Sequence, residues 1–297
     1  MTWFLILVPI ALALFLVLMY FNNRTNGALI SGGRRRRYLL HVPDSYDPDR
    51  PSPLVVCFHG FVQWPAHQAR LSGWNTLADR EGLLVVYPRG TGFPLRWMAQ
   101  PSRGDPRGPE REVAFFIDLL EHLCQSYDID RSRVYVNGMS NGGGMCHLLG
   151  CEVGNRLAAL GGVAGAYLYR RRTEQAGPPV PVIAFHGVDD PVVPYQGGWS
   201  RIRRHEIHYQ PVEAWLGEWA QHNGCQPQPL IEQVTDRVTR ISYQGCGPGA
   251  DTILYQIEGA GHTWPGGGWL PRWLTGKINR EISATHLMWE FFQHHHR

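Results

Sequence analysis

The chain has 297 residues, of which 43% are hydrophobic and 18% are charged, and 28 Lys and Arg against 25 Asp and Glu give a formal charge of +3. This charge is well below the basic excess of proteins that bind phosphate backbones, which argues against a nucleic-acid partner. With 34 Gly, 22 Pro and 11 Trp, the composition favours a loop-rich enzyme or binding domain over a helical bundle or a disordered chain.

The chain opens with an apolar segment. Residues 3–21 form a run of 19 residues without a formal charge, which is long enough to cross a bilayer as a helix. A cleaved signal peptide is the alternative, although its apolar stretch is usually shorter and preceded by positive charge. We therefore expect residues 1–23 to be an N-terminal hydrophobic anchor, a transmembrane helix, or a signal segment. No second run of this length follows, which excludes a multi-span transporter.

After a polar linker at residues 24–35, strand-like apolar runs alternate with amphipathic segments of helical length. This alternation predicts a mostly parallel sheet covered by helices, in one α/β domain over residues 36–297. In chain order, the predicted strands are residues 38–42, 54–58, 83–87, 134–136, 157–163, 180–185 and 252–257. The predicted helices are residues 71–80, 112–127, 141–153, 212–223 and 282–294, and the C-terminal histidines 294–296 are expected to form a solvated helix end.

A nucleophile motif lies where a predicted strand meets a predicted helix. Gly138, Ser140 and Gly142 form the pattern G-x-S-x-G, in which the serine occupies a strained elbow at the carboxyl edge of a sheet. The backbone N–H of Asn141 would then lie at a helix N-terminus, where it can stabilise a developing oxyanion. A glycine-rich turn with a capping serine is the alternative interpretation.

A serine nucleophile needs a general base and a carboxylate that orients this base. In this architecture the chain order is Ser, then Asp or Glu, then His. Asp189 and Asp190 follow the strand at residues 180–185, and His262 lies in a glycine-flanked loop after the strand at residues 252–257. The sequence therefore predicts a triad that joins the serine to His262 and to one of the two aspartates.

A second oxyanion donor should come from the loop after an early strand. The strand at residues 54–58 is followed by His59 and Gly60, so the backbone N–H of Phe61 is the natural candidate. A simple tight turn would give the same pattern. No spacing of cysteines and histidines suggests a zinc site, and neither a metal nor an organic cofactor is expected.

Five stretches carry a family resemblance: His59-Gly60, residues 77–82 with residues 85–88, residues 133–143, residues 186–195 and residues 261–267. The last is the most specific, because His262 is followed one residue on by Trp-Pro-Gly-Gly. Together they resemble the polyhydroxybutyrate depolymerase and feruloyl or acetylxylan esterase family. The resemblance implies an α/β-hydrolase fold with helices on both faces of the sheet. It also implies a serine carboxylic ester hydrolase that works through an acyl-enzyme.

The resemblance further implies that Asp190 is the orienting acid, with Asp189 as the alternative. It also implies that Cys225 and Cys246 form a disulfide, with two buried thiols as the alternative. Such a bond requires an oxidising compartment, which predicts an extracytoplasmic protein, either membrane-anchored or secreted. The arginine cluster at residues 34–37 opposes this orientation by the positive-inside tendency, unless it only marks the start of the first strand.

Tryptophans lie in or near the loops expected around the catalytic face: Trp64, Trp97, Trp199, Trp264, Trp269 and Trp273. Trp64, Trp264 and Trp269 are the candidates for substrate binding, with Trp264 and Trp269 flanking the acyl pocket. Buried packing is the alternative for any single one of these tryptophans. The expected partners are a small-molecule or polymeric ester and, through the N-terminal helix, a membrane. Alternatives are a serine peptidase or acyltransferase on the same fold, or a non-catalytic polymer-binding module.

Overall fold

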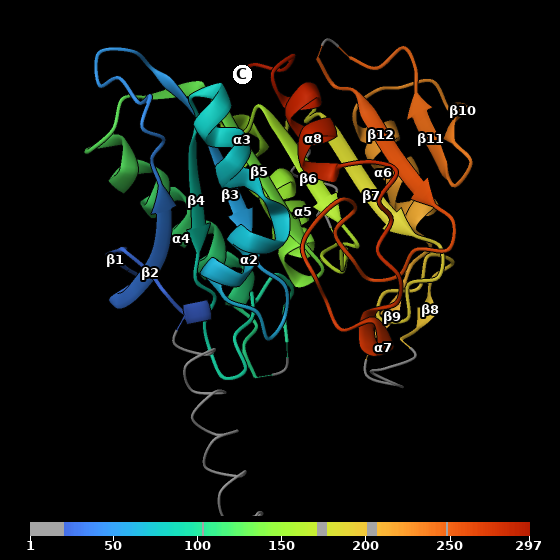
Figure 1. Cartoon of the computed structure of the whole chain (residues 1–297), viewed down its shortest axis with the longest axis horizontal. Helices are drawn as coiled ribbons and strands as arrows, with labels where there is room; N and C mark the ends of the chain where they lie inside the picture. The colour runs from blue at the N-terminus through green and yellow to red at the C-terminus, as the bar shows by residue number, and fades with distance from the viewer. Residues whose placement is uncertain (1–20, 103, 171–176, 201–206, 248) are drawn as a thin grey trace, which may run out of the picture.

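The computed structural model describes residues 21–102, 104–170, 177–200, 207–247 and 249–297, and its core is one large sheet (Figure 1). The ten strands of this sheet have the order β1-β2-β4-β3-β5-β6-β7-β12-β11-β10. Their bounds are Gly27–Ser31 (β1), Arg34–His41 (β2), Ser52–Phe58 (β3), Leu84–Pro88 (β4), Ile129–Met139 (β5), Ala159–Val163 (β6), Val182–Gly187 (β7), Pro229–Thr235 (β10), Val238–Tyr243 (β11) and Thr252–Ile257 (β12). A separate pair is formed by β8 (Gly198–Trp199) and β9 (His208–Tyr209).

The middle of the sheet is parallel, from β4 through β3, β5, β6 and β7 to β12. Antiparallel pairs extend it at both edges, through β2 and β1 on one side and β11 and β10 on the other. Strands β3, β4, β6 and β7 are buried along their whole length, which is why they read as continuous apolar runs. Because parallel strands end at one edge, the loops after β3, β5, β7 and β12 meet there.

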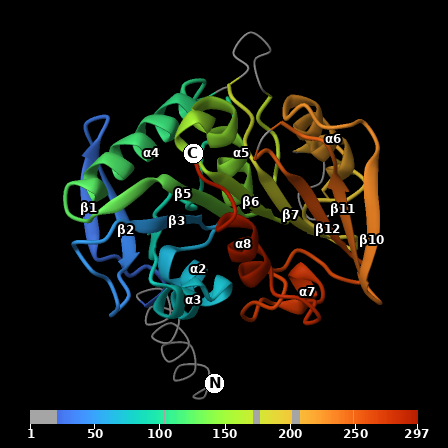
Figure 2. The ribbon, with the colours of Figure 1, turned by 90° about the horizontal axis from the view of Figure 1, so that it is seen from above.

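Helices cover both faces of the sheet. Figure 2 shows α4, α5 and α6 on one face and α2, α3, α7 and α8 on the other. Their bounds are Pro65–Ser72 (α2), Trp74–Glu81 (α3), Gly108–Cys124 (α4), Asn141–Val153 (α5), Val212–His222 (α6), Arg272–Thr275 (α7) and Ala284–Phe292 (α8). Each face has its own apolar core, so the sheet is the middle layer of three. The expected mostly parallel sheet with helices on both faces is confirmed.

Several elements differ from expectation: β8, β9, β10, β11 and α7 were not predicted, and β5 begins earlier than expected. Two further differences concern a divided helix and the expected linker. The helix expected at residues 71–80 is divided at Gly73, whose φ of 72° ends α2 before α3 begins. The expected linker at residues 24–35 instead contains β1, which pairs antiparallel with β2. Gly32 and Gly33 connect the two strands with φ of 53° and 72°, as a two-residue hairpin turn requires. The folded domain therefore begins before residue 36.

The predicted N-terminal anchor or signal at residues 1–23 lies almost entirely outside the described residues. Within the part of the chain that the structure describes, no helix has the length and apolar character needed to cross a membrane.

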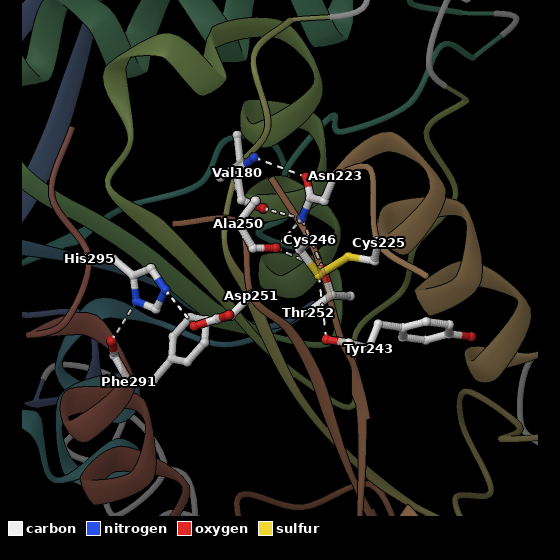
Figure 3. Close-up of polar contacts among 10 residues, drawn as sticks. All are labelled: Val180, Asn223, Cys225, Tyr243, Cys246, Ala250, Asp251, Thr252, Phe291 and His295. Atoms are coloured by element: carbon white, nitrogen blue, oxygen red, sulfur yellow. Dashed lines mark hydrogen bonds and ion pairs between the residues drawn. A yellow bond between two sulfur atoms is a disulfide. The ribbon is translucent and has the colours of Figure 1, made fainter. Parts of the chain in front are cut away.

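A disulfide joins Cys225, just after α6, to Cys246, in the loop after β11. Beside it, the Asn223 side chain donates to the backbone carbonyls of Val180 and Ala250, at 2.8 and 3.0 Å (Figure 3). The same side chain accepts the backbone N–H of Val180 at 3.1 Å. The disulfide and this amide together fasten the end of α6 to the segments that lead into β7 and β12.

Replacing both Cys225 and Cys246 by serine is expected to lower the free energy of unfolding by about 3 kcal/mol in the chain-entropy model. The cross-link spans 21 residues, and its loss increases the conformational freedom of the unfolded chain. Denaturant titration without reductant measures the change. Cys124→Ser, at an unpaired and half-buried cysteine, is the matched control. An equal loss in both variants would show that the cross-link is not the cause.

At the C-terminus, His294 and His296 are exposed as expected, whereas His295 is packed against the domain. His295 is buried, its Nδ1 donates to the Phe291 carbonyl at 2.7 Å, and its Nε2 lies 3.1 Å from the Asp251 carboxylate (Figure 3). The Tyr135 hydroxyl donates to the His295 carbonyl at 2.9 Å. Because both ring nitrogens have partners, the imidazole is buried without an unsatisfied polar atom.

Candidate active site

Ser140 occupies the tight turn between β5 and α5. Its backbone has φ 55° and ψ −119°, a conformation that costs a non-glycine residue about 1–3 kcal/mol. Neighbouring segments hold this turn: the Ser140 N–H donates to the Val163 carbonyl, and the Ala166 N–H donates to the Ser140 carbonyl, each at 2.9 Å. The expected strained elbow between a strand and a helix is therefore present.

The two glycines of the motif are required by close backbone approach. A Cβ on Gly142 would lie 2.2 Å from the backbone oxygen of Phe58 in β3. A Cβ on Gly138 would lie 2.6 Å from the backbone carbon of Gly142 and 2.8 Å from the same Phe58 oxygen. No side chain can move aside to relieve these contacts, since every atom involved is backbone. The two glycines thus allow the first turn of α5 to pack closely against the end of β3.

A buried aspartate and a buried histidine are in contact in the loops after β7 and β12. Nδ1 of His262 lies 2.7 Å from Oδ2 of Asp190, and the two residues are 6% and 4% exposed. The other carboxylate oxygen of Asp190 accepts the backbone N–H groups of Val192 and Val193 at 2.7 and 2.8 Å. Asp189 is exposed. Of the two candidate aspartates, Asp190 is the one that contacts the histidine.

The environment of Asp190 favours its ionised form. Burial alone would raise the pKa of this carboxyl, but the charges and hydrogen bonds of His262 and His186 hold the pKa well below its ordinary value. An ionised carboxylate can only accept hydrogen bonds, so Nδ1 of His262 carries the proton in their contact. Nε2 is then the ring nitrogen that is left to accept a proton.

His186, at the end of β7, lies against the same aspartate. Its Nε2 is 2.9 Å from the Val193 carbonyl and 3.4 Å from Oδ2 of Asp190. Nε2 is the donor, because a carbonyl only accepts, and the buried Nδ1 has no partner among the described residues. His186 therefore ties together the loop that carries Asp190. The described residues include no group of three or more His, Cys, Asp or Glu side chains that could hold a metal ion.

A cavity of about 310 Å³ opens beside the serine. Ser140, Asn141 and Phe61 all line it, so both predicted oxyanion donors belong to residues at the same cavity. Gly60 makes this corner compact, since a Cβ there would lie 3.4 Å from the Ser140 Cβ and 2.9 Å from the Gln63 amide oxygen. The loop after β3 thus approaches the serine as expected.

Trp97 is held in place by the residue that follows the serine. The Asn141 side chain accepts the Trp97 N–H at 2.7 Å and donates to the Trp97 carbonyl at 3.1 Å. The indole N–H of Trp97 donates to the backbone oxygen of His59 at 2.9 Å. Nε2 of His59 accepts the Gly90 N–H, and burial lowers the pKa of His59 to about 4, so this ring is neutral at pH 7. One wall of the cavity is therefore rigidly attached to the elbow.

The three tryptophans expected to bind substrate lie elsewhere. Trp264 is fully buried, with its indole N–H donating to the Thr285 hydroxyl at 3.0 Å, whereas Trp269 is 76% exposed. Trp64 is half-buried at the start of α2. None of the three is among the described residues that line the cavity beside the serine, where the tryptophan is Trp97.

One known protein family matches the chain over most of the segment that carries this site. Residues 37–193, more than half of the chain, match the model of the family described as esterase PHB depolymerase. The chain belongs to the esterase PHB depolymerase family. The matched segment includes Ser140 and Asp190 and ends before His262. The role predicted for His262 therefore rests on chain order and on its contact with Asp190.

Several curated relatives of the chain are named as esterases. The chain is 26% identical over 236 residues to the bifunctional acetylxylan esterase/xylanase XynS20E of Neocallimastix patriciarum, covering 78% of this chain and 31% of that protein. It is 26% identical over 235 residues to feruloyl esterase B of Piromyces equi, covering 76% and 42%. The chain thus spans less than half the length of these two relatives. For the putative esterase NocK of Nocardia uniformis, 26% identity extends over 86% of this chain and 79% of that protein.

Among solved structures, an acetyl xylan esterase from Aspergillus awamori superimposes with a TM-score of 0.58 at 15% sequence identity. The match covers 82% of this chain and 91% of that one. At this identity the likeness shows the fold alone, which for this esterase PHB depolymerase family member is of the α/β-hydrolase type.

Proposed function

We propose that the chain is a serine carboxylic ester hydrolase in which Ser140, His262 and Asp190 form a catalytic triad. The observation that carries the proposal is the buried 2.7 Å contact between His262 and Asp190 at the sheet edge where the strained serine stands. Strands β5, β6, β7 and β12 are successive neighbours, so the three loops lie side by side. The feruloyl and acetylxylan esterase names of the relatives support ester substrates.

The mechanism has two acyl-transfer steps. Nε2 of His262 accepts the Ser140 proton as Oγ attacks the ester carbonyl carbon, and the alcohol leaves with that proton. Water then gives a proton to His262 and attacks the acyl-enzyme, which releases the acid and restores the serine. Asp190 stays ionised throughout and stabilises the imidazolium that forms in each step.

Backbone N–H groups stabilise the tetrahedral oxyanion in this mechanism. The N–H of Asn141 is the first of α5, where the helix dipole favours negative charge. The N–H of Phe61 is the second donor, from the loop after β3. The hydrogen bonds that join Asn141, Trp97 and His59 keep this corner in shape before substrate arrives, which is the condition for effective electrostatic stabilisation.

The proposed location is extracytoplasmic. Disulfides persist in oxidising compartments, so the bond between Cys225 and Cys246 supports this location. The apolar sequence of residues 3–21 supports an N-terminal anchor or signal that would take the domain there.

A fluorophosphonate probe tests the nucleophile. We expect it to label the full-length protein and the Ser102→Ala variant, but not Ser140→Ala, which should also lose about 10⁴-fold or more in kcat on p-nitrophenyl acetate. Ser102 is the matched control, because it lines the same cavity without standing at the elbow. Labelling of Ser140→Ala would overturn the assignment. Faster turnover of a p-nitroanilide than of the matching ester would favour a peptidase.

A further inference from the structure

Arg96 carries the only formal charge among the described residues that line the cavity beside Ser140. The other lining side chains are apolar or neutral, and include Trp97, Leu168 and Tyr209. Binding cavities are lined mostly by apolar side chains, and the few polar or charged groups in them fix the orientation of the ligand. A single cation in a cavity with otherwise neutral walls is therefore a group that can orient a ligand.

Arg96 has no counter-ion in the part of the chain that the structure describes. Its Nε donates to the thioether of Met98 at 3.4 Å, a weak acceptor, and no carboxylate lies within ion-pair distance. Nearby arginines differ: Arg36 pairs with Glu112 at 2.9 Å, and Arg111 pairs with Asp105. The guanidinium of Arg96 thus keeps N–H donors for a ligand, although its side chain is half-buried.

The backbone around Arg96 is rigid. Thr91 and Arg96 exchange two backbone hydrogen bonds, at 3.0 and 3.1 Å, which close a small hairpin. The next residue, Trp97, is held through both of its backbone polar groups by the side chain of Asn141, immediately after the serine. These hydrogen bonds hold the Arg96 backbone in place relative to the nucleophile.

A second cavity of about 360 Å³ adjoins the first, since Arg96, Met98 and Ser102 line both. The antiparallel strand β2 begins at the edge where the parallel strands end, and so brings two more arginines to this cavity. Its charged lining residues are Arg34, Arg36, Arg96, Arg111, Asp105 and Glu112. Both carboxylates are already paired, which leaves an excess of positive charge in this adjoining cavity.

We propose that Arg96 is a specificity-determining residue that selects esters carrying a free carboxylate on the acid or alcohol side. A guanidinium binds a carboxylate through two parallel hydrogen bonds, which fixes orientation as well as adding affinity. The surrounding positive charge attracts such anions to the cavity. This inference rests on the proposed function and narrows its substrate class to acidic esters, such as monoesters of dicarboxylic acids.

The test compares monomethyl adipate with methyl hexanoate, which has the same chain length and no carboxylate, by pH-stat titration of the full-length protein. Arg96→Gln is expected to lower the ratio of kcat/KM for the acidic ester to that for the neutral ester by about tenfold, mainly through KM. Arg96→Lys keeps the charge without the bidentate geometry and should lose less. Arg131→Gln removes an exposed arginine that pairs with Glu121 at 2.7 Å, and should leave the ratio unchanged.

A binding measurement separates the two proposals. Calorimetry should detect monomethyl adipate binding to Ser140→Ala, and at least tenfold weaker binding to Ser140→Ala with Arg96→Gln. If the protein hydrolyses methyl hexanoate and the ratio of kcat/KM for the acidic to the neutral ester is equal in wild type and Arg96→Gln, the acidic-ester inference is overturned. The esterase proposal then still stands. Arg96-dependent binding without hydrolysis of either ester would support the carboxylate site and overturn the proposed function. Thermal unfolding shows whether Arg96→Gln has a folding defect. If it has one, the kcat/KM ratio of Arg96→Lys is the test, and a ratio equal to that of wild type overturns the inference.

Discussion

Asp190→Asn is expected to lower kcat on p-nitrophenyl acetate by about 10⁴-fold. One oxygen of Asp190 accepts the N–H groups of Val192 and Val193, and the other contacts Nδ1 of His262. An asparagine would keep its oxygen toward the two backbone donors and turn its NH₂ group toward His262. The ring would then carry its proton on Nε2, the tautomer that cannot accept a proton from Ser140.

Asp189→Asn is the matched control, since it removes the same charge from the neighbouring, exposed residue. This variant should stay within about twofold of the wild-type kcat, because exposed charges are screened by solvent. Comparable losses in the two variants would contradict the assignment of Asp190, and so would a near-normal kcat for Asp190→Asn at unchanged stability.

Asp190→Asn should also change how the stability of the protein depends on pH. The pKa of Asp190 in the folded protein is lowered, so its ionised form stabilises the fold above the unfolded pKa of about 4, and this contribution is lost as pH falls. The difference in unfolding free energy between wild type and Asp190→Asn should therefore be largest near neutral pH and shrink below about pH 4. Urea titrations at several pH values measure it.

The central architecture was predictable because the parallel strands are buried on both faces. β12 occupies the predicted residues 252–257, and α5 the predicted residues 141–153, since a continuous apolar run or a glycine-rich elbow marks each of them. The proposed site rests on the same logic, since chain order predicts Ser140 and His262 in loops at one sheet edge. Asp189 and Asp190 could not be separated by pattern, because only the turn after β7 decides which carboxylate is buried.

Features that depend on tertiary contacts could not be predicted in this way. Trp264 is buried in the apolar core on one face of the sheet, where its indole N–H donates to Thr285 in α8. The unpaired state of Arg96 likewise depends on which carboxylates the fold brings near it. β1 was a missed local signal, since Gly32-Gly33 is a recognisable hairpin turn between the apolar residues 28–30 and the arginine-rich start of β2.

Gly142→Ala is expected to lower the free energy of unfolding by about 3 kcal/mol or more, at the upper end of overpacking effects. The added methyl group would lie 2.2 Å from the Phe58 oxygen and 2.7 Å from the His59 oxygen, both backbone atoms. Relief therefore requires α5 to move away from β3, which also displaces the elbow serine from Phe61. Activity should fall with stability, measured by denaturant titration and by kcat on an aryl ester.

Gly217→Ala, inside α6, controls for the general effect of alanine on a helix. A Cβ there meets only the Tyr243 hydroxyl, at an ordinary contact distance of 3.5 Å. Alanine has the higher helix propensity by up to about 1 kcal/mol, so this variant should be as stable as wild type or more stable. If the free energy of unfolding falls in Gly142→Ala and does not fall in Gly217→Ala, the loss comes from the contact between α5 and β3. A stable and active Gly142→Ala would mean that the serine elbow does not need the close approach that the structure shows.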